Sequence, residues 1–158
     1  MQQYRIEIKW AIIFVVFSLF WVFGERLVGL HDELIAQHPT WTNLIAIPAI
    51  IIYVLALRDK RDHFYEGKMS WKQGFLAGAI MTLIVAVLSP LTQFLTATVI
   101  TPDYFANAIA YSVESGNATQ EEAEAFFNLN SYLVLAAVGA LVMGLVTSAI
   151  VAIFVRRA

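Results

Sequence analysis

The chain has 158 residues, of which 59% are hydrophobic and only 14% are charged, with a formal net charge of −2. Soluble domains are about 45–50% apolar and about 25% charged, so a soluble fold would have too little polar surface to cover this apolar material. The acidic balance argues against a nucleic-acid partner, and the absence of cysteine excludes disulfides, thiolate metal sites and cysteine nucleophiles.

Four apolar runs approach the length that a helix needs to cross a bilayer, about 20 residues for a hydrocarbon core about 30 Å thick. They cover residues 10–30, 41–57, 73–100 and 131–155. The first follows a basic start but lacks a small-x-small cleavage site after it, which indicates an uncleaved anchor. The sequence therefore predicts a single domain, 1–158, that is an all-α integral membrane protein with four transmembrane helices.

The far end of the first run carries an adjacent acid and base, Glu25 and Arg26. Neighbouring residues on a helix point about 100° apart, so a mutual salt bridge is not expected. Arg26 can extend to the headgroups, and Glu25 can turn inward or reach the segment beyond the third span. A position at the membrane boundary is the favoured interpretation, and an intramembrane polar site is the alternative.

The link after the first run holds four residues of types that bind metals: His31, Asp32, Glu33 and His38. Their spacing fits no known ligand pattern such as H-E-x-x-H, and Pro39 follows directly. We therefore expect a solvated loop here, with no metal and no other cofactor.

The link at 58–72 is basic and ends in the sequence SWKQ, which has the spacing of a capping box between Ser70 and Gln73. This predicts a helix start at Trp71. Three basic residues of the link are candidates for contact with anionic lipid headgroups: Arg58, Lys60 and Arg61. A topology signal without a specific ligand is the favoured alternative.

The third and fourth runs each carry small residues at every fourth position. The main members of these stripes are Gly74, Gly78, Ala140, Gly144 and Ser148. Spacing of four places each set on one helix face, and small residues permit close contact between helices in lipid. We expect the two helices to pack together within one subunit, with self-association as the alternative.

The third run also contains Pro90, which predicts a bend because proline removes a helical hydrogen bond. Around it lies a polar cluster of Ser89, Thr92, Gln93 and Thr96, in which Gln93 is a candidate intramembrane polar site. Hydroxyl groups that bond to their own helix are the simple interpretation, and the lining of a small cavity is the alternative.

Residues 101–130 carry no Lys or Arg and predict two short helices. The motif Thr-Pro-Asp at 101–103 is typical of a helix start, Ser-Gly-Asn at 115–117 of a stop, and Thr-Gln-Glu-Glu at 119–122 of a second capping box. We expect a helical hairpin between the third and fourth spans that caps the bundle or meets a partner protein.

Charge placement predicts the orientation. Nine of the ten Lys and Arg residues lie before the first span, between the second and third, or after the fourth, all on one side of a four-span chain. The positive-inside rule then places both termini in the cytoplasm and the hairpin outside it.

The stretch YEGKMSWKQGFLAG, residues 65–78, resembles the bacterial membrane family catalogued as domain of unknown function four-one-nine-nine. The resemblance extends to the acidic stretch 101–127 and to the glycine-containing final helix with its basic end. Trp71 stands where the family often has Phe. The resemblance implies a small four-span protein of the bacterial cytoplasmic (inner) membrane with no established activity, and it carries over no catalytic residue.

The sequence holds no paired carboxylates, no nucleophile elbow and no phosphate-binding glycine loop, so an enzyme is not expected. We expect a non-enzymatic structural or accessory subunit, or a protein that binds lipid or a partner. The alternative is a small transporter or channel built by oligomerisation. The expected partners are membrane lipids and either a second copy or another membrane protein that meets the hairpin.

Overall fold

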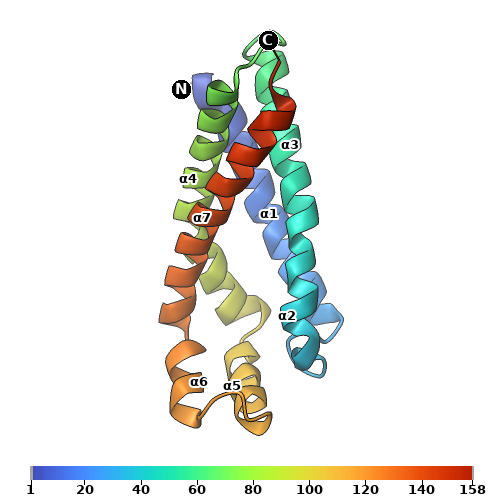
Figure 1. Cartoon of the computed structure of the whole chain (residues 1–158). Helices are drawn as coiled ribbons and strands as arrows, with labels where there is room; N and C mark the ends of the chain where they lie inside the picture. The colour runs from blue at the N-terminus through green and yellow to red at the C-terminus, as the bar shows by residue number, and fades with distance from the viewer. Residues whose placement is uncertain (1, 158) are drawn as a thin grey trace.

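Four long helices dominate the structure, a computed structural model that describes residues 2–157 (Figure 1). They are α1 (Arg5–Leu27), α3 (Ala46–His63), α4 (Trp71–Leu95) and α7 (Leu129–Val155). Four helical segments are long and apolar enough to cross a membrane: Arg5–Leu27, Ile35–His63, Trp71–Ile100 and Leu129–Val155. The predicted all-helical fold with four membrane-length helices is thus confirmed.

The remaining elements are short. A 3₁₀ turn (Gln2–Tyr4) precedes α1, and three helical turns lead into α3: Ile35–Gln37, α2 (His38–Trp41) and Thr42–Ile45. A π-helical turn (Thr96–Ile100) continues α4, and the hairpin consists of α5 (Tyr104–Glu114) and α6 (Gln120–Phe126). Both chain ends lie at one end of the bundle, here named the termini end. The opposite end, which holds α2, α5 and α6, is named the hairpin end (Figure 1).

Both predicted capping boxes are present. The Ser70 hydroxyl accepts from the Gln73 N–H (3.3 Å), and the Gln73 side chain accepts from the Ser70 N–H (2.8 Å), so α4 begins at Trp71 as predicted. Thr119 and Glu122 form the same pair of bonds at the start of α6. The Thr119 N–H donates to the Glu122 carboxylate and thereby lowers the pKa of that group.

Helix α5 begins at Tyr104, later than the Thr-Pro-Asp motif predicts. The reason is that Thr101 belongs to the preceding element: its N–H and its hydroxyl both bond to the Thr96 carbonyl (2.8 and 3.3 Å) and close the π-helical turn. The predicted stop is confirmed, since α5 ends at Glu114 and Gly116 has a φ of 72°. Glycine adopts this left-handed conformation without steric cost.

The closest helix packing in the bundle joins α4 to α7 along the two stripes of small residues. A Cβ added to Gly78 would lie 2.6 Å from the Ser148 Cβ, and one added to Gly144 would lie 2.5 Å from the Thr82 Cγ2. Neither position has room for a larger side chain, so these residues allow the close approach of the two helices. The other members of the packing are Gly74, Ala140 and Ala152.

A short chain of hydroxyl groups lies inside this packing. The Tyr53 hydroxyl lies 2.8 Å from the Thr82 hydroxyl, which lies 3.4 Å from the hydroxyl of Ser148. Ser148 donates in turn to the Gly144 carbonyl (2.7 Å). The three side chains are buried, and the chain links α3, α4 and α7 in the middle of the bundle.

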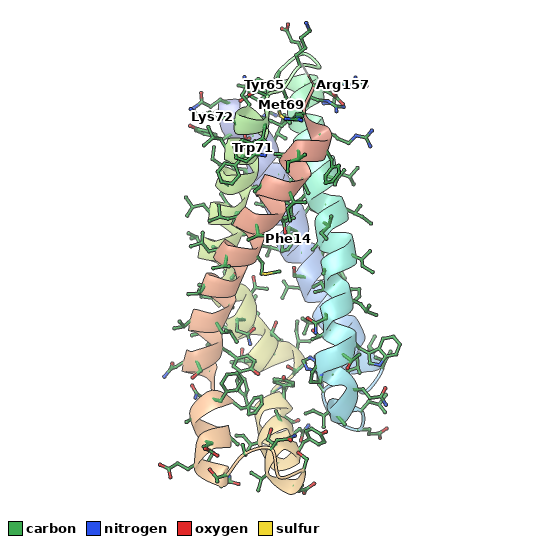
Figure 2. The ribbon with its side chains drawn as sticks, in the orientation of Figure 1. Phe14, Tyr65, Met69, Trp71, Lys72 and Arg157 are labelled. Carbon is green, nitrogen blue, oxygen red and sulfur yellow. The ribbon has the colours of Figure 1, made fainter. Side chains whose placement is uncertain are left out.

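The termini end is closed by a buried ion pair and a short backbone bridge. The Lys60 ammonium lies 2.9 Å from the Glu7 carboxylate, and both side chains are 4% exposed. Met69 and Arg157 exchange backbone hydrogen bonds of 2.9 Å in both directions, which fixes the chain end beside the start of α4. Figure 2 shows Met69 and Arg157 together at this end, near Trp71 and Lys72.

The outward faces of the long helices are apolar. Phe20 of α1, Val87 of α4 and Phe154 of α7 are among the most exposed side chains, at 70%, 71% and 80%. Large apolar side chains exposed along the full length of a bundle are typical of helices that are solvated by lipid.

Candidate functional site

A cavity of about 160 Å³ lies at the hairpin end, and we name it the hairpin-end cavity. It is bounded by α1, the turns that lead into α3, the end of α4, and by α5 and α7. Its polar lining consists of Glu25, His31, His38, Thr42, Gln93, Thr96, Thr101, Tyr104 and Tyr132.

Glu25 enters this cavity from the last turn of α1. Its carboxylate is buried, with the residue only 5% exposed. Trp21, one turn earlier on the same helix, donates its indole N–H to Glu25 Oε1 (2.7 Å). This bond holds one carboxylate oxygen against α1, and the other oxygen, Oε2, is the one that lies near the two histidines.

His31 is brought back over the end of α1 by a tight turn. Gly29 has a φ of 83°, and the Leu30 N–H donates to the Glu25 carbonyl (3.0 Å). Asn107 of α5 donates to the His31 carbonyl (2.9 Å) and fixes the turn against the hairpin. The His31 ring is buried, and its Nδ1 has no hydrogen-bond partner within residues 2–157.

His38 is the first residue of α2, and its ring centroid lies 5.0 Å from that of His31. Pro39 occupies the first turn of that helix. Backbone N–H groups in a first turn have no partner within the helix, so the N–H that proline lacks costs no helical hydrogen bond. The His38 Nδ1 lies 3.4 Å from the hydroxyl of Tyr104, and its side chain is 17% exposed.

These three residues converge, and we name them the Glu–His–His cluster. Glu25 Oε2 lies 3.4 Å from His31 Nε2 and 3.8 Å from His38 Nε2. One potential metal-ligand atom from each residue lies within 4.8 Å of the other two. Within the described part of the chain, the two imidazoles are the basic groups within ion-pair distance of the Glu25 carboxylate.

Aromatic rings from the hairpin cover the cluster. Tyr104 of α5 packs against both imidazoles, with ring centroids 5.3 Å from His31 and 5.2 Å from His38. Behind it, Tyr132 of α7 packs edge-on against Phe105 at 5.0 Å. Burial raises the pKa of Tyr104, so its phenol stays neutral and acts as a hydrogen-bonding group.

A second cavity, also of about 160 Å³, lies between α1, α4 and α7, nearer the middle of the bundle than the first. This mid-bundle cavity shares Val22, Gln93 and Thr96 with the hairpin-end cavity. Three other hydroxyl groups line it, and each donates to a carbonyl of its own helix: those of Ser18, Ser89 and Thr92. Because each hydroxyl has only one proton, these groups offer acceptor lone pairs to the cavity.

The three residues singled out as a polar site in the sequence lie in different surroundings. Gln93 lines the same cavity as Glu25, although they come from different helices. Arg26 does not line the cavity, is exposed, and donates to the Ile100 carbonyl at the end of the π-helical turn. The structure thus separates the adjacent acid and base, and Glu25 turns inward.

The three basic residues considered for headgroup contact also differ in their surroundings. Arg58 is exposed, whereas Lys60 and Arg61 are buried. Lys60 pairs with Glu7, and the Arg61 guanidinium bonds to Asp62 and to the backbone of α7. The charged groups of Lys60 and Arg61 are therefore engaged inside the protein.

The expectation of a solvated loop around His31 and His38 is wrong. Residues 28–45 form a tight turn and a series of helical turns that pack on the bundle, and they place both imidazoles beside Glu25. Asp32 and Glu33 are exposed and do not line the cavity. The sequence signal was weak because the carboxylate comes from a different element and no fixed ligand spacing exists.

Comparison with known proteins gives a family. The family model described as Protein of unknown function (DUF4199) matches residues 9–157. The chain belongs to this family. The match includes the Glu–His–His cluster and both cavities, and it confirms the resemblance found in the sequence. No curated protein and no solved structure matches the chain.

The lining of the hairpin-end cavity determines what chemistry it supports. One carboxylate and two imidazoles offer an acceptor-rich site, and the surrounding Gln and Thr side chains add further oxygen atoms. Glu25 is the one carboxylate among the described residues that line the cavity. The arrangement therefore suits the binding of a cation better than acid–base catalysis by a pair of carboxylates.

Proposed function

We propose that this chain is a non-enzymatic, multi-pass protein of the bacterial cytoplasmic membrane that binds a small cation in the hairpin-end cavity. The observation that supports the proposal is the buried carboxylate of Glu25, whose neighbours among the described residues are two imidazoles, Trp21 and Thr42, with no Lys or Arg. A carboxylate taken out of water costs several kcal/mol unless it is paired. A cation in the cavity supplies that pairing.

The proposed orientation places both termini in the cytoplasm and the cation site near the outer surface. Nine of the ten Lys and Arg residues belong to segments at the termini end of the bundle, and Arg26 is the exception. The positive-inside rule favours the cytoplasm for that end. In this orientation the cavity takes its cation from outside the cytoplasm.

The proposed role is that of an accessory subunit whose hairpin contacts other components of the membrane. The hairpin exposes carboxylates on α6, together with Phe126, which is 53% exposed. An exposed aromatic ring beside acidic groups suits a partner with a complementary basic surface. A second copy of the chain and membrane lipids are the other partners in this proposal.

Thermal unfolding of the purified full-length protein in detergent tests cation binding. The protein is heated in the presence of Na⁺, K⁺, Mg²⁺, Ca²⁺ or Zn²⁺, and the Tm is compared among wild type, Glu25→Gln and Glu33→Gln. Glu33 is an exposed carboxylate outside the cavity and serves as the control. At least one cation is expected to raise the Tm of wild type and of Glu33→Gln but not of Glu25→Gln. Equal shifts in all three proteins, or none, would refute the proposal.

A second candidate function is transport by an oligomer, and the mid-bundle cavity favours it. This cavity lies next to the hairpin-end cavity on the side of the middle of the bundle, and its hydroxyl groups offer acceptor lone pairs. Gln93 lines both cavities. Cation flux into liposomes that is lost in Gln93→Leu would establish this function, and the absence of flux in wild type would exclude it.

A further inference from the structure

We infer that the cation is a divalent transition-metal ion of the Zn²⁺ type, bound by Glu25, His31 and His38. The inference rests on the proposed function and specifies its ligand. Two imidazole nitrogens and a carboxylate oxygen form a donor set that suits Zn²⁺ and its transition-metal neighbours. Ca²⁺ and Mg²⁺ prefer six or more ligands, all of them oxygen, and this cluster does not provide such a set.

Both separations from Glu25 Oε2 are longer than hydrogen bonds and lie within or just above the range between two ligands of one ion. Donor atoms bound to a tetrahedral Zn²⁺ at about 2.0–2.2 Å lie about 3.3–3.6 Å from one another. Glu25 Oε2 lies 3.4 Å from His31 Nε2 and 3.8 Å from His38 Nε2. An N–H···O hydrogen bond has a heavy-atom distance of about 2.7–3.2 Å, so both separations exceed that range.

Besides the two imidazoles, the Glu25 carboxylate has Trp21 and Thr42 as hydrogen-bonding neighbours, and neither of them carries a charge. Trp21 occupies the other oxygen of Glu25. The Tyr104 hydroxyl lies 3.4 Å from His38 Nδ1, the nitrogen that does not face Glu25, and an outer-shell partner at that position orients a metal-bound imidazole. Asn107 fixes the backbone at His31.

His31 is the more deeply buried of the two imidazoles in the cluster. Its side chain is 7% exposed, its Nδ1 has no hydrogen-bond partner among the described residues, and its Nε2 lies too far from Glu25 for a normal hydrogen bond. The unpartnered Nδ1 costs free energy comparable to one lost hydrogen bond. A metal ion on Nε2 gives the ring a ligand role at this buried position, which accounts for an imidazole here rather than an apolar side chain.

Three protein ligands leave a fourth position of a tetrahedral ion for water or for a small ligand from the cavity. The ion also joins three segments, since its ligands come from α1, the turn after it and α2. Tyr104 connects His38 to the hairpin, and Asn107 connects His31 to it. Metal binding is therefore expected to stabilise the hairpin end as a unit.

Cobalt titration of the full-length protein tests the inference. The protein is purified in detergent, its affinity tag is removed, and it is stripped with a chelator and titrated with Co²⁺. The readouts are the visible absorption of tetrahedral Co²⁺ and the metal content by mass spectrometry. One Co²⁺ per chain, displaced by Zn²⁺, is expected. The variants His31→Gln, His38→Gln and Glu25→Gln are expected to weaken binding more than about 100-fold, since changes in the outer shell alone cost about 10–100-fold.

His63→Gln is the matched control, because His63 is the third histidine and lies exposed at the other end of α3. It is expected to bind Co²⁺ like wild type. Circular dichroism and size-exclusion chromatography verify that each variant is folded. Binding that survives in the cluster variants, or that is lost in His63→Gln, would overturn the inference.

The outcomes also separate this inference from the proposed function. If no transition metal binds but another cation raises the Tm in a Glu25-dependent way, the metal assignment is wrong and cation binding stands. If neither a transition metal nor any other cation raises the Tm in a Glu25-dependent way, the metal assignment and the proposed cation binding are both wrong.

Discussion

Adding a single methyl group at Gly144 tests the packing that holds the bundle together. A Cβ at this position would lie 2.5 Å from Thr82 Cγ2, 2.6 Å from Thr82 Oγ1 and 2.8 Å from Tyr53 Oη. Carbon atoms in favourable contact lie about 3.5–4.0 Å apart, so the shortfall is about 1 Å against two other helices. Thr82 is fully buried and bonded to Tyr53, and it cannot move without disturbing that bond.

The expected change in the free energy of unfolding for Gly144→Ala has three contributions. Overpacking of a well-packed core costs about 1–3 kcal/mol. Strain in the Tyr53–Thr82 hydrogen bond removes up to about 1 kcal/mol more. The higher helix propensity of alanine returns about 1 kcal/mol. Gly144→Ala is therefore expected to lower the free energy of unfolding by up to about 3 kcal/mol, and the larger side chain in Gly144→Leu is expected to prevent stable folding.

Gly139→Ala is the matched control, since Gly139 lies on the same helix and an added Cβ there meets no atom within 4 Å. Its expected effect is between zero and a stabilisation of about 1 kcal/mol. Reversible unfolding in mixed micelles of increasing denaturing-detergent content measures both variants. Equal stabilities for the two alanine variants would refute the packing described for α4 and α7.

Two further predictions follow from the termini end and from the orientation. Lys60→Met leaves Glu7 buried without its partner and is expected to cost about 3–5 kcal/mol in the same unfolding assay. Lys9→Met removes a half-exposed partner from Asp59, which keeps the Trp10 indole and His63 as neighbours, and is expected to cost less than about 1 kcal/mol. Similar losses in both variants would contradict the buried pair. The chain has no cysteine, so single cysteines placed at the exposed positions Ser115 and His63 report their side of the membrane through an impermeant maleimide. Labelling at 115 in intact cells and at 63 only after lysis is expected, and the reverse pattern would invert the orientation.

Local patterns made much of the fold predictable. The apolar runs marked the four long helices, and both capping boxes marked helix starts because capping depends on residues three positions apart. The small residues at every fourth position on α4 and α7 marked faces that the structure brings into contact. Each of these signals is contained within one helix or one helix end.

The site was harder to predict because its parts come from different elements. Glu25 was a candidate on its own, but His31 joins it only through the Gly29 turn and His38 only through the helical turns before α3. Lys60 gives a parallel case at the other end, since its partner Glu7 belongs to a different helix. Spacing along the chain does not predict contacts between residues of different elements. Metal-binding residue types without a fixed spacing look the same in the sequence as an ordinary polar loop.

Zinc K-edge X-ray absorption on the full-length protein in lipid nanodiscs tests the central claim most directly. Binding by the Glu–His–His cluster requires a first shell of about four nitrogen and oxygen atoms at about 2.0–2.2 Å, with outer-shell scattering from two imidazole rings. The scattering of one ring should disappear in His38→Gln. A first shell of six oxygen atoms without imidazole scattering, or a spectrum unchanged by that substitution, would contradict the claim.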